Sequence, residues 1–396
     1  MVKVLRILNR FNVGGPTHNA TYLTKFLSPE YETKLIAGKK LDSEASSEYI
    51  LKKYSIDYFI VKNMNRSLNL VKDIKAFIEI RRIIKEYKPD IIHTHASKSG
   101  ALGRLAAISL KVPIIIHTFH GHVFHSYFGK LKSYMYVLIE RYLAKKSSAI
   151  IAISDLQKKE ISKDFRICPP EKISVIPLGF DLDKFQKNVV EDRSAFRNEF
   201  MLSDDFIAIG IIGRLTSIKN HELFIKSIHQ VLPMIKNRIK VFIVGDGEDK
   251  EDLLNLSRSL NLSFGTINKK NKNALIQFIS WRSDMTAVYA GLDIVALTSL
   301  NEGTPVTLIE AQAAKKPIVS TDVGGVRDIV TKDKTGLISD SKDINGFTNN
   351  LKKLIENKDL RDSLGAAGYE NVYEKFNYRR LVSDVKSLYN RLENEK

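Results

Sequence analysis

Cysteine and tryptophan each occur only once in the 396 residues, as Cys168 and Trp281. A single cysteine excludes an intramolecular disulfide and fits a reducing compartment. Long apolar segments are missing too, since the longest runs, such as residues 112–116, have the length of a strand and not of a membrane span. The N-terminal residues mix charged and apolar side chains, so no signal peptide is expected. These absences predict a cytoplasmic protein.

Acidic residues are scarce relative to basic ones. The chain has 45 aspartates and glutamates against 62 lysines and arginines, which gives a formal net charge of +17. Such an excess is typical of proteins that bind nucleic acid, anionic membranes or anionic substrates, and a lysine-rich genome produces the same bias without function. The sequence contains no helix-turn-helix, zinc-finger or base-stacking motif. We therefore expect an anionic membrane surface or substrate as partner, and no nucleic acid.

Strand-like apolar segments alternate with amphipathic helix-like segments along the chain. This alternation predicts an α/β fold of doubly wound parallel sheets, in which ligands bind at the carboxyl ends of the strands. The length of 396 residues indicates two domains of about 180 residues each. We place an N-terminal domain at residues 1–183 and a C-terminal domain at residues 184–378, with a polar connector at residues 186–205. The last helix, within residues 379–396, is expected to pack back on the first domain.

Polar groups suited to a ligand follow the predicted strands of the first domain. Gly14 and Gly15 would let the backbone approach an anion, although the Gly-x-Gly-x-x-Gly fingerprint of dinucleotide-binding proteins is absent. Later strand ends carry five histidines: His93, His95, His117, His120 and His122. Such histidines suit a sugar or phosphate site, and no metal is expected because no carboxylate or cysteine completes a ligand spacing. Lys98 and Arg104 follow at a strand-to-helix switch.

The second domain contains a strand, a short loop and a helix start at residues 293–311. The pattern predicts a helix capped by Thr304, with Pro305 in the first turn, where a missing N–H has no consequence. Such a helix start attracts an anion. The expected donors are the backbone amides of Gly303, Thr304, Val306 and Thr307. Glu302 precedes this anion site, and Glu310 lies about one turn further in, where it could accept hydrogen bonds from sugar hydroxyls.

Two cations follow another predicted strand of the same domain. Gly213 and Arg214 come directly after the apolar residues 206–212, and Lys219 follows in the same loop. An arginine binds a diphosphate as a fork and a lysine binds it as a point charge. We therefore expect Arg214 and Lys219 to neutralise a diphosphate.

Aromatic and basic side chains are interleaved at residues 124–146. This pattern suits a helix at the interface of an anionic leaflet, and it equally suits a core helix with a solvated basic face.

These motifs resemble those of the retaining glycosyltransferases of family 4, which have the GT-B fold. The resemblance covers nearly the whole chain. Its specific segments are residues 281–285 and 298–306, and residues 322–326 add to them. The histidine segments 93–100 and 117–122 look like the branch that serves bacterial exopolysaccharide, capsule and O-antigen lipopolysaccharide assembly. The resemblance implies two Rossmann-like domains facing a central cleft, a UDP-sugar donor, a polyprenyl-linked or polysaccharide acceptor, and no cofactor. It also implies a peripheral location on the inner face of the plasma membrane.

The resemblance assigns donor contacts residue by residue. Arg214 and Lys219 would hold the donor diphosphate and stabilise the leaving UDP, beside Gly213 and the segment Gly303, Thr304, Pro305 and Val306. Glu310 would bind the ribose, and Glu302 would bind hydroxyls of the transferred sugar. Transfer would retain the anomeric configuration and need no metal, with the leaving phosphate helping to deprotonate the acceptor.

The resemblance also assigns contacts in the first domain. His120 would contact the transferred sugar, and the Gly14-Gly15 loop would cover the donor phosphates or shape the acceptor site. The acceptor region would include Lys98, Arg104 and His122. His122 departs from the aromatic residue expected there, so its role stays open.

Two other functions fit the same residues. A UDP-sugar epimerase of the same architecture would convert a UDP-sugar with no acceptor present. A non-catalytic basic protein would bind membranes or nucleic acid in a salt-dependent way without nucleotide affinity.

Overall fold

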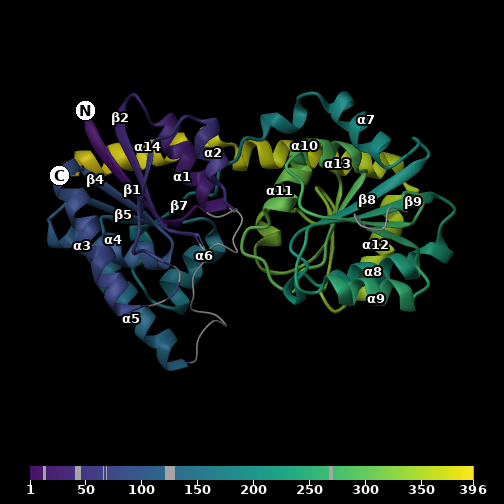
Figure 1. The fold of residues 1–396 in the computed structure, drawn as a ribbon, viewed down its shortest axis with the longest axis horizontal. Coiled ribbons are helices and arrows are strands. Elements are labelled where there is room, and N and C mark those ends of the chain that lie inside the picture. Colours follow the sequence, from purple (N-terminus) through teal and green to yellow (C-terminus); the bar gives the residue numbers. More distant parts are fainter. Residues whose placement is uncertain are drawn as a thin grey trace. The chain divides into compact units, whose positions relative to one another are not determined.

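The computed structural model describes residues 1–11, 15–40, 46–65, 67, 69–120, 130–266 and 271–395. The chain forms two compact units, the first made of Met1–Phe180 and Phe376–Lys396 and the second of Asp181–Lys375. In Figure 1 the first unit runs from purple to blue and includes the yellow helix α14, and the second unit follows from teal to yellow-green. Each unit has its own sheet and its own apolar core.

The first unit is built on seven parallel strands in the order β3-β2-β1-β4-β5-β6-β7. The strands are β1 (Val2–Arg10), β2 (Tyr31–Gly38), β3 (Tyr58–Val61), β4 (Ile91–His95), β5 (Ile114–Phe119), β6 (Ala149–Ala152) and β7 (Ile173–Val175). The α-helices are α1 (Gly15–Phe26), α2 (Glu48–Lys53), α3 (Leu70–Tyr87), α4 (Ser97–Ser109), α5 (Lys130–Lys146), α6 (Asp155–Lys159) and α14 (Tyr378–Asn394). The strand order changes direction between β1 and β4, where ligands bind in doubly wound folds.

The two faces of this sheet bury different apolar clusters, because side chains alternate along each strand. Val4 of β1 packs with α1 and α14, and Leu381 of α14 belongs to the same cluster. Leu5 and Ile7 point to the opposite face and pack against α3 and α4. The C-terminal helix α14 therefore completes the helical layer that α1 begins, and the two helices are in contact (Figure 1).

The second unit repeats this plan with seven parallel strands in the order β10-β11-β9-β8-β12-β13-β14. The strands are β8 (Phe206–Ile212), β9 (Arg238–Val244), β10 (Phe264–Thr266), β11 (Ile276–Ile279), β12 (Ile294–Leu297), β13 (Ile318–Thr321) and β14 (Leu337–Ser339). The α-helices are α7 (Val189–Glu199), α8 (His221–Val231), α9 (Lys250–Ser259), α10 (Met285–Gly291), α11 (Val306–Ala313), α12 (Ile344–Glu356) and α13 (Lys358–Phe376).

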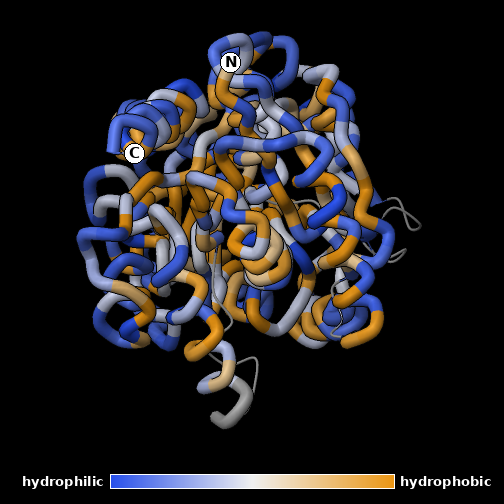
Figure 2. The backbone as a smooth tube through the Cα atoms, turned by 90° about the vertical axis from the view of Figure 1, so that its left-hand side faces the viewer, coloured by the Kyte–Doolittle hydropathy of each residue, from blue (hydrophilic) through white to orange (hydrophobic). Residues whose placement is uncertain are grey.

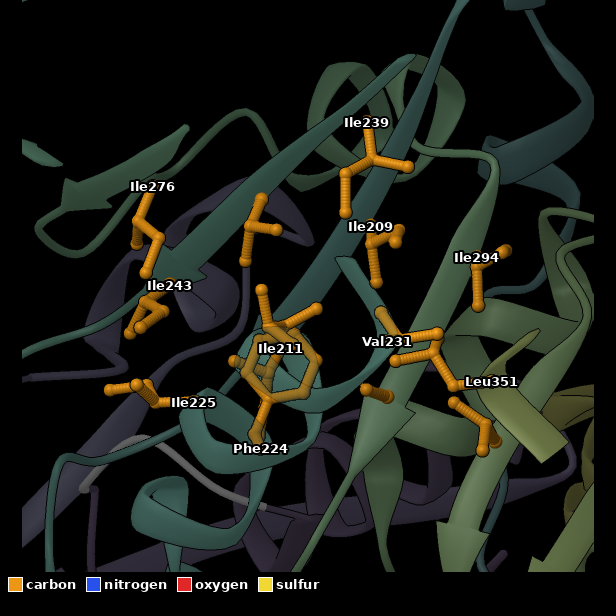
Figure 3. Close-up of a cluster of buried hydrophobic side chains, with 14 of the residues drawn as sticks. Ile209, Ile211, Phe224, Ile225, Val231, Ile239, Ile243, Ile276, Ile294 and Leu351 are labelled. Carbon is orange, nitrogen blue, oxygen red and sulfur yellow. The ribbon is translucent and has the colours of Figure 1, made fainter. Parts of the chain in front are cut away.

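One face of the second sheet carries a large apolar cluster. Ile209 and Ile211 of β8 pack with Phe224 of α8 and Leu351 of α12, as Figure 3 shows. In Figure 2 apolar residues are likewise concentrated toward the interior and hydrophilic residues on the outer turns. The strands are nearly continuous apolar runs because helices cover both faces of a parallel sheet. A rigid sheet of this kind fixes the loops at its edges.

The N-terminal part of the first unit ends at Phe180, and the polar segment at residues 186–205 belongs to the second unit. Helix α7 forms within this segment. Phe196 is buried against the ring of Phe242, with centroids 5.0 Å apart, and Arg197 Nη1 lies 3.2 Å from a carboxylate oxygen of Asp293. The sequence pattern missed this helix because these long-range contacts, and not a periodic apolar stripe, hold it in place.

Candidate active site

The carboxyl ends of β8, β12 and β13 are neighbours at one edge of the second sheet. The loop after β8 contains Arg214 and Lys219, the loop after β12 contains Glu302, and a Gly-Gly turn at residues 324–325 follows β13. The topology thus brings together three segments that lie far apart in the sequence. Ligands of parallel α/β sheets bind at this edge.

Lys219 and Glu302 form an ion pair at this edge. Nζ of Lys219 lies 2.5 Å from Oε1 of Glu302, and the two side chains are 28% and 9% exposed. Ser299 donates from Oγ to the same carboxylate oxygen at 2.6 Å. Thr298 Oγ1 contacts the backbone oxygens of Lys219 and Asn220 at 3.1 and 2.9 Å. The two residues that follow β12 therefore hold the Glu302 carboxylate and the backbone at Lys219, while the ammonium group stays partly accessible.

The Gly-Gly turn supports the backbone that carries Glu302. Gly324 has a φ of +48°, which favours glycine, and a Cβ there would collide with the carbonyl oxygen of Glu302. A Cβ on Gly325 would collide with the carbonyl oxygen of Gly303. The N–H of Gly325 donates to the carbonyl oxygen of Glu302 at 3.0 Å. This close approach fixes the loop that presents the carboxylate.

The predicted capping of the next helix by Thr304 is wrong. Helix α11 begins at Val306, and its N-cap residue is Pro305, which has extended backbone and makes no side-chain capping bond. A tertiary contact stabilises the first turn instead, because Thr307 Oγ1 donates to the carbonyl oxygen of Ile212 in β8 at 3.4 Å. First-turn amides have no acceptor within their own helix, so the start of α11 still favours an anion.

Glu310 lies within α11 and is held by two groups. The hydroxyl of Tyr289 donates to Oε2 of Glu310 at 3.1 Å, and Nζ of Lys184 lies 3.9 Å from Oε1. Burial raises the pKa of Glu310, and the charge of Lys184 and the hydrogen bond from Tyr289 oppose this effect. The side chain of Glu310 is 21% exposed, which leaves room for a ligand hydroxyl.

Arg214 is largely exposed. Its Nη2 lies 3.5 Å from Oε2 of Glu248, and 67% of its side chain is accessible. An exposed pair of this kind contributes little, so the guanidinium can turn toward a ligand. The neighbouring Gly213 leaves the space beside Lys219 open, since a Cβ there would meet only that side chain at 4.0 Å.

The histidines of the first unit lie at the ends of β4 and β5. Nδ1 of His95 and Nε2 of His120 are 2.9 Å apart and share a hydrogen bond. His93 bonds to the hydroxyls of Tyr389 and Thr118, each at 2.7 Å. In the described part of the chain, no group of three or more histidine, cysteine, aspartate or glutamate residues is placed to hold a metal ion.

Burial lowers the pKa of His120 to about 3. The pKa values of His93 and His95 also lie well below the usual range because of burial, and the fully buried Arg6 contributes to both shifts. These rings are therefore neutral near pH 7. His120 can exchange hydrogen bonds with a ligand, but it cannot supply a positive charge.

The other predicted residues of the first unit have different surroundings. Lys98 pairs with Asp73 at 2.5 Å, and the two side chains are 12% and 17% exposed. Arg104 is fully buried, and its Nη2 lies 2.9 and 2.7 Å from the two carboxylate oxygens of Glu140. This ion pair joins α4 to α5 and gives Arg104 a packing role.

The predicted Gly14-Gly15 loop is described only in part. Gly15 begins α1, and a Cβ on it would lie 3.1 Å from the side chain of Leu178. Gly14 and His122 lie outside the described residues.

Comparison with known proteins identifies the family. Residues 192–371 match the model described as "Glycosyl transferases group 1", and residues 13–184 match "Glycosyltransferase Family 4". An Escherichia coli protein named UDP-Gal:alpha-D-GlcNAc-diphosphoundecaprenol alpha-1,3-galactosyltransferase is 31% identical over 339 residues, which cover 85% of this chain and 84% of that protein. The chain belongs to the family 4 glycosyltransferases.

Other relatives agree with this assignment. The capsular polysaccharide biosynthesis glycosyltransferase CapM of Staphylococcus aureus is 27% identical over 351 residues, covering 86% of this glycosyltransferase and 87% of CapM. The crystal structure of HepE from Anabaena in complex with UDP superposes with a TM-score of 0.81 at 18% identity, covering 98% of this chain and 100% of that one. The fold is therefore the two-domain α/β GT-B fold.

Ser299, Tyr289 and Lys184 hold the two carboxylates of the glycosyltransferase site and were not predicted. Ser299 holds Glu302, and Tyr289 and Lys184 hold Glu310. Ser299 could have been found, because a serine three residues before a glutamate in a tight loop can reach its carboxylate. Tyr289 and Lys184 give no such signal, because each contacts Glu310 across a long stretch of sequence.

Proposed function

We propose that this glycosyltransferase moves a sugar from a UDP-sugar to a lipid-linked or polysaccharide acceptor in the assembly of bacterial exopolysaccharide, capsule or O-antigen. The observation that carries the proposal is the Lys219–Glu302 pair beside the start of α11. It combines a partly exposed cation, a sugar-binding carboxylate and a helix start that favours anions. A nucleotide diphosphate bearing a sugar presents the complementary groups.

The donor residues would act mainly through charge. Lys219 and Arg214 would neutralise the diphosphate as the glycosidic bond breaks, which lowers the barrier without a metal. Glu302 would turn from Lys219 to the hydroxyls of the transferred sugar, and Glu310 would hold the ribose. His120 would contact the transferred sugar as a neutral ring.

We further propose that transfer proceeds with retention and with the leaving phosphate helping to deprotonate the acceptor. Two-carboxylate glycosidases place an acid and a base or nucleophile on either side of the scissile bond. Glu302 follows β12 and Glu310 lies within α11, held by Tyr289. These surroundings suit hydroxyl binding by both glutamates. They do not suit one glutamate as acid and the other as base or nucleophile.

The acceptor is proposed from the relatives. The E. coli relative acts, by its name, on a sugar attached to diphosphoundecaprenol, and CapM serves capsular polysaccharide. We therefore place the enzyme peripherally on the inner, anionic leaflet of the plasma membrane. No helix in the described ranges is long and apolar enough to cross a bilayer.

Exposed apolar side chains on two helices of the first unit support membrane contact. Leu70, Ile74 and Ile78 of α3 are 77%, 51% and 60% exposed and lie on one stripe of the helix. On α5 the exposed apolar residues are Tyr134, Met135, Leu138, Ile139 and Tyr142. Exposed cations accompany both sets, including Lys75 and Arg82 on α3 and Lys145 and Lys146 on α5. Apolar stripes flanked by cations suit an anionic lipid interface.

The proposal is tested by incubating the enzyme with a panel of UDP-sugars, with and without a polyprenyl-diphosphate sugar. We expect UDP release that depends on the acceptor and continues in EDTA. Conversion of the UDP-sugar without an acceptor would show an epimerase instead. Complete loss of activity in EDTA would contradict metal independence, and absence of turnover with every UDP-sugar would contradict the donor.

A further inference from the structure

A second histidine of the first sheet holds His120. Nδ1 of His95, the last residue of β4, lies 2.9 Å from Nε2 of His120, which follows β5. His95 is fully buried, and His120 is partly exposed. We propose that His95 is a positioning residue for sugar transfer, because it donates from Nδ1 to His120 and thereby fixes the proton of His120 on Nδ1. The inference rests on the proposed function, in which His120 contacts the transferred sugar.

A single proton lies between the two rings. Burial keeps the pKa of both histidines well below the usual range, so both rings are neutral near pH 7. A neutral imidazole has one N–H and one nitrogen that accepts, and the hydrogen bond made by one nitrogen decides which of the two carries the proton. The bond between His95 and His120 therefore permits two arrangements, in which this proton belongs to one ring or to the other.

The two outer nitrogens of the pair decide between these arrangements. Among the described residues, neither Nε2 of His95 nor Nδ1 of His120 has a hydrogen-bond partner, and both atoms are buried. A buried N–H without a partner is rarer in proteins than a buried acceptor without one. A proton on Nδ1 of His95 leaves only an unpaired acceptor in the interior and puts the unpaired N–H on the partly exposed His120. The opposite arrangement would leave the unpaired N–H on the fully buried ring.

The favoured arrangement gives His120 a free hydrogen-bond donor. A buried donor without a partner costs free energy until an acceptor binds to it. Hydroxyl and carbonyl oxygens of a sugar are such acceptors. The Nδ1–H of His120 would therefore donate to the transferred sugar, and His95 would act through His120 without touching the sugar.

Neighbouring elements hold His95 in place. The ring of His93 stacks on that of His95, with centroids 4.3 Å apart and an angle of 23° between the planes. Both nitrogens of His93 are bonded, Nδ1 to the hydroxyl of Tyr389 and Nε2 to that of Thr118. The hydroxyl of Ser99 donates to the carbonyl oxygen of His95. These contacts keep His95 in the orientation that its hydrogen bond requires.

Nitrogen NMR of the histidine rings tests the inference without a substrate. In the wild-type protein with isotope-labelled histidine, we expect a protonated Nδ1 and an unprotonated Nε2 on His120. In His95→Phe, which keeps a stacking ring but has no donor, His120 should show both tautomers. His117→Phe is the control, because it changes a fully buried histidine that bonds to Thr94 and should leave the tautomer of His120 as in the wild type. A proton on Nε2 of His120 in the wild-type protein would overturn the inference.

Kinetics complete the test. The kcat of acceptor-dependent UDP release should fall about tenfold in folded His95→Phe, with the KM for the UDP-sugar close to wild type, because His120 loses the bond that orients its ring. His95→Asn should restore most of kcat, because its amide nitrogen is as many bonds from the backbone as Nδ1 and donates in the same way. Wild-type kcat in folded His95→Phe would overturn the inference. Absence of UDP release by the wild-type enzyme with every UDP-sugar would contradict the proposed function alone, because the NMR measurement needs no substrate.

Discussion

At the scale of single residues, the buried histidines couple stability to pH. Burial lowers the pKa of His120 from its usual value near 6.5 to about 3, and the pKa values of His93, His95 and His117 fall well below the usual range. The unfolded chain therefore binds protons that the folded chain excludes. Stability from this source is fully present above about pH 6.5 and is lost as the pH falls toward 3, with a slope of up to about 1.4 kcal/mol per pH unit for each histidine.

The prediction is checked by measuring Tm of the wild-type protein and of His120→Asn between pH 4 and pH 7. Replacing His120 should flatten the fall of Tm with decreasing pH, because the variant lacks a side chain that binds a proton in the unfolded chain and not in the folded chain. His229→Gln changes an exposed histidine of α8 and should leave the pH dependence as in the wild type. An unchanged pH dependence in His120→Asn would show that His120 is not held neutral.

At the scale of elements, the Gly-Gly turn after β13 is expected to control activity through the position of Glu302. A Cβ on Gly325 would collide with the carbonyl oxygen of Gly303, so Gly325→Ala must displace the loop at residues 302–303. A displacement of about 1 Å costs about 100-fold in rate. We predict a loss of about that size in the turnover of Gly325→Ala, measured by UDP release, with a folded protein by circular dichroism.

Gly303→Ala is the control variant, because it adds a Cβ to the same loop without a collision. An added Cβ at Gly303 meets no atom within 4 Å, so this variant should keep the wild-type Tm. If Gly325→Ala keeps full turnover, the Gly-Gly turn does not position Glu302.

The elements themselves were largely predictable from the sequence, and their long-range supports were not. Apolar segments correctly indicated the strands β8 and β12, because helices cover both faces of a parallel sheet and its strands are buried. The start of α11 and the presence of α7 were missed, since Thr307 and Phe196 act through contacts with distant strands. The residues that follow Glu302, from Gly303 to Val306, were predicted as candidates for donor binding. The ion pair that joins Lys219 to Glu302 depends on the pairing of β8 with β12 and is visible only in the fold.

At the scale of the whole molecule, the exposed apolar stripe on α3 predicts binding to anionic membranes. The variant Leu70→Ser/Ile74→Ser removes two exposed apolar side chains and should weaken binding to phosphatidylglycerol-containing vesicles by about tenfold. Cosedimentation measures this binding, which should also weaken at high salt because the lipid attraction is screened.

Val190→Ser alters an exposed apolar residue of the second unit and should bind vesicles like the wild type. Equal vesicle binding by wild type and the α3 variant would exclude this stripe as the contact. A concentration-dependent dimer in the absence of lipid, lost in the variant, would identify a second copy as the occupant.

The central claim is that the Lys219–Glu302 pair binds and activates a UDP-sugar, and a matched pair of lysine variants tests it most directly. The chain offers a second lysine–glutamate pair, Lys226–Glu222 on α8, with the same Nζ–Oε1 distance of 2.5 Å but no place at the strand edge. Acceptor-dependent UDP release should fall about 100- to 1000-fold in Lys219→Ala, because the developing charge on the diphosphate loses its cation, and should be unchanged in Lys226→Ala. Wild-type release by folded Lys219→Ala would contradict the account.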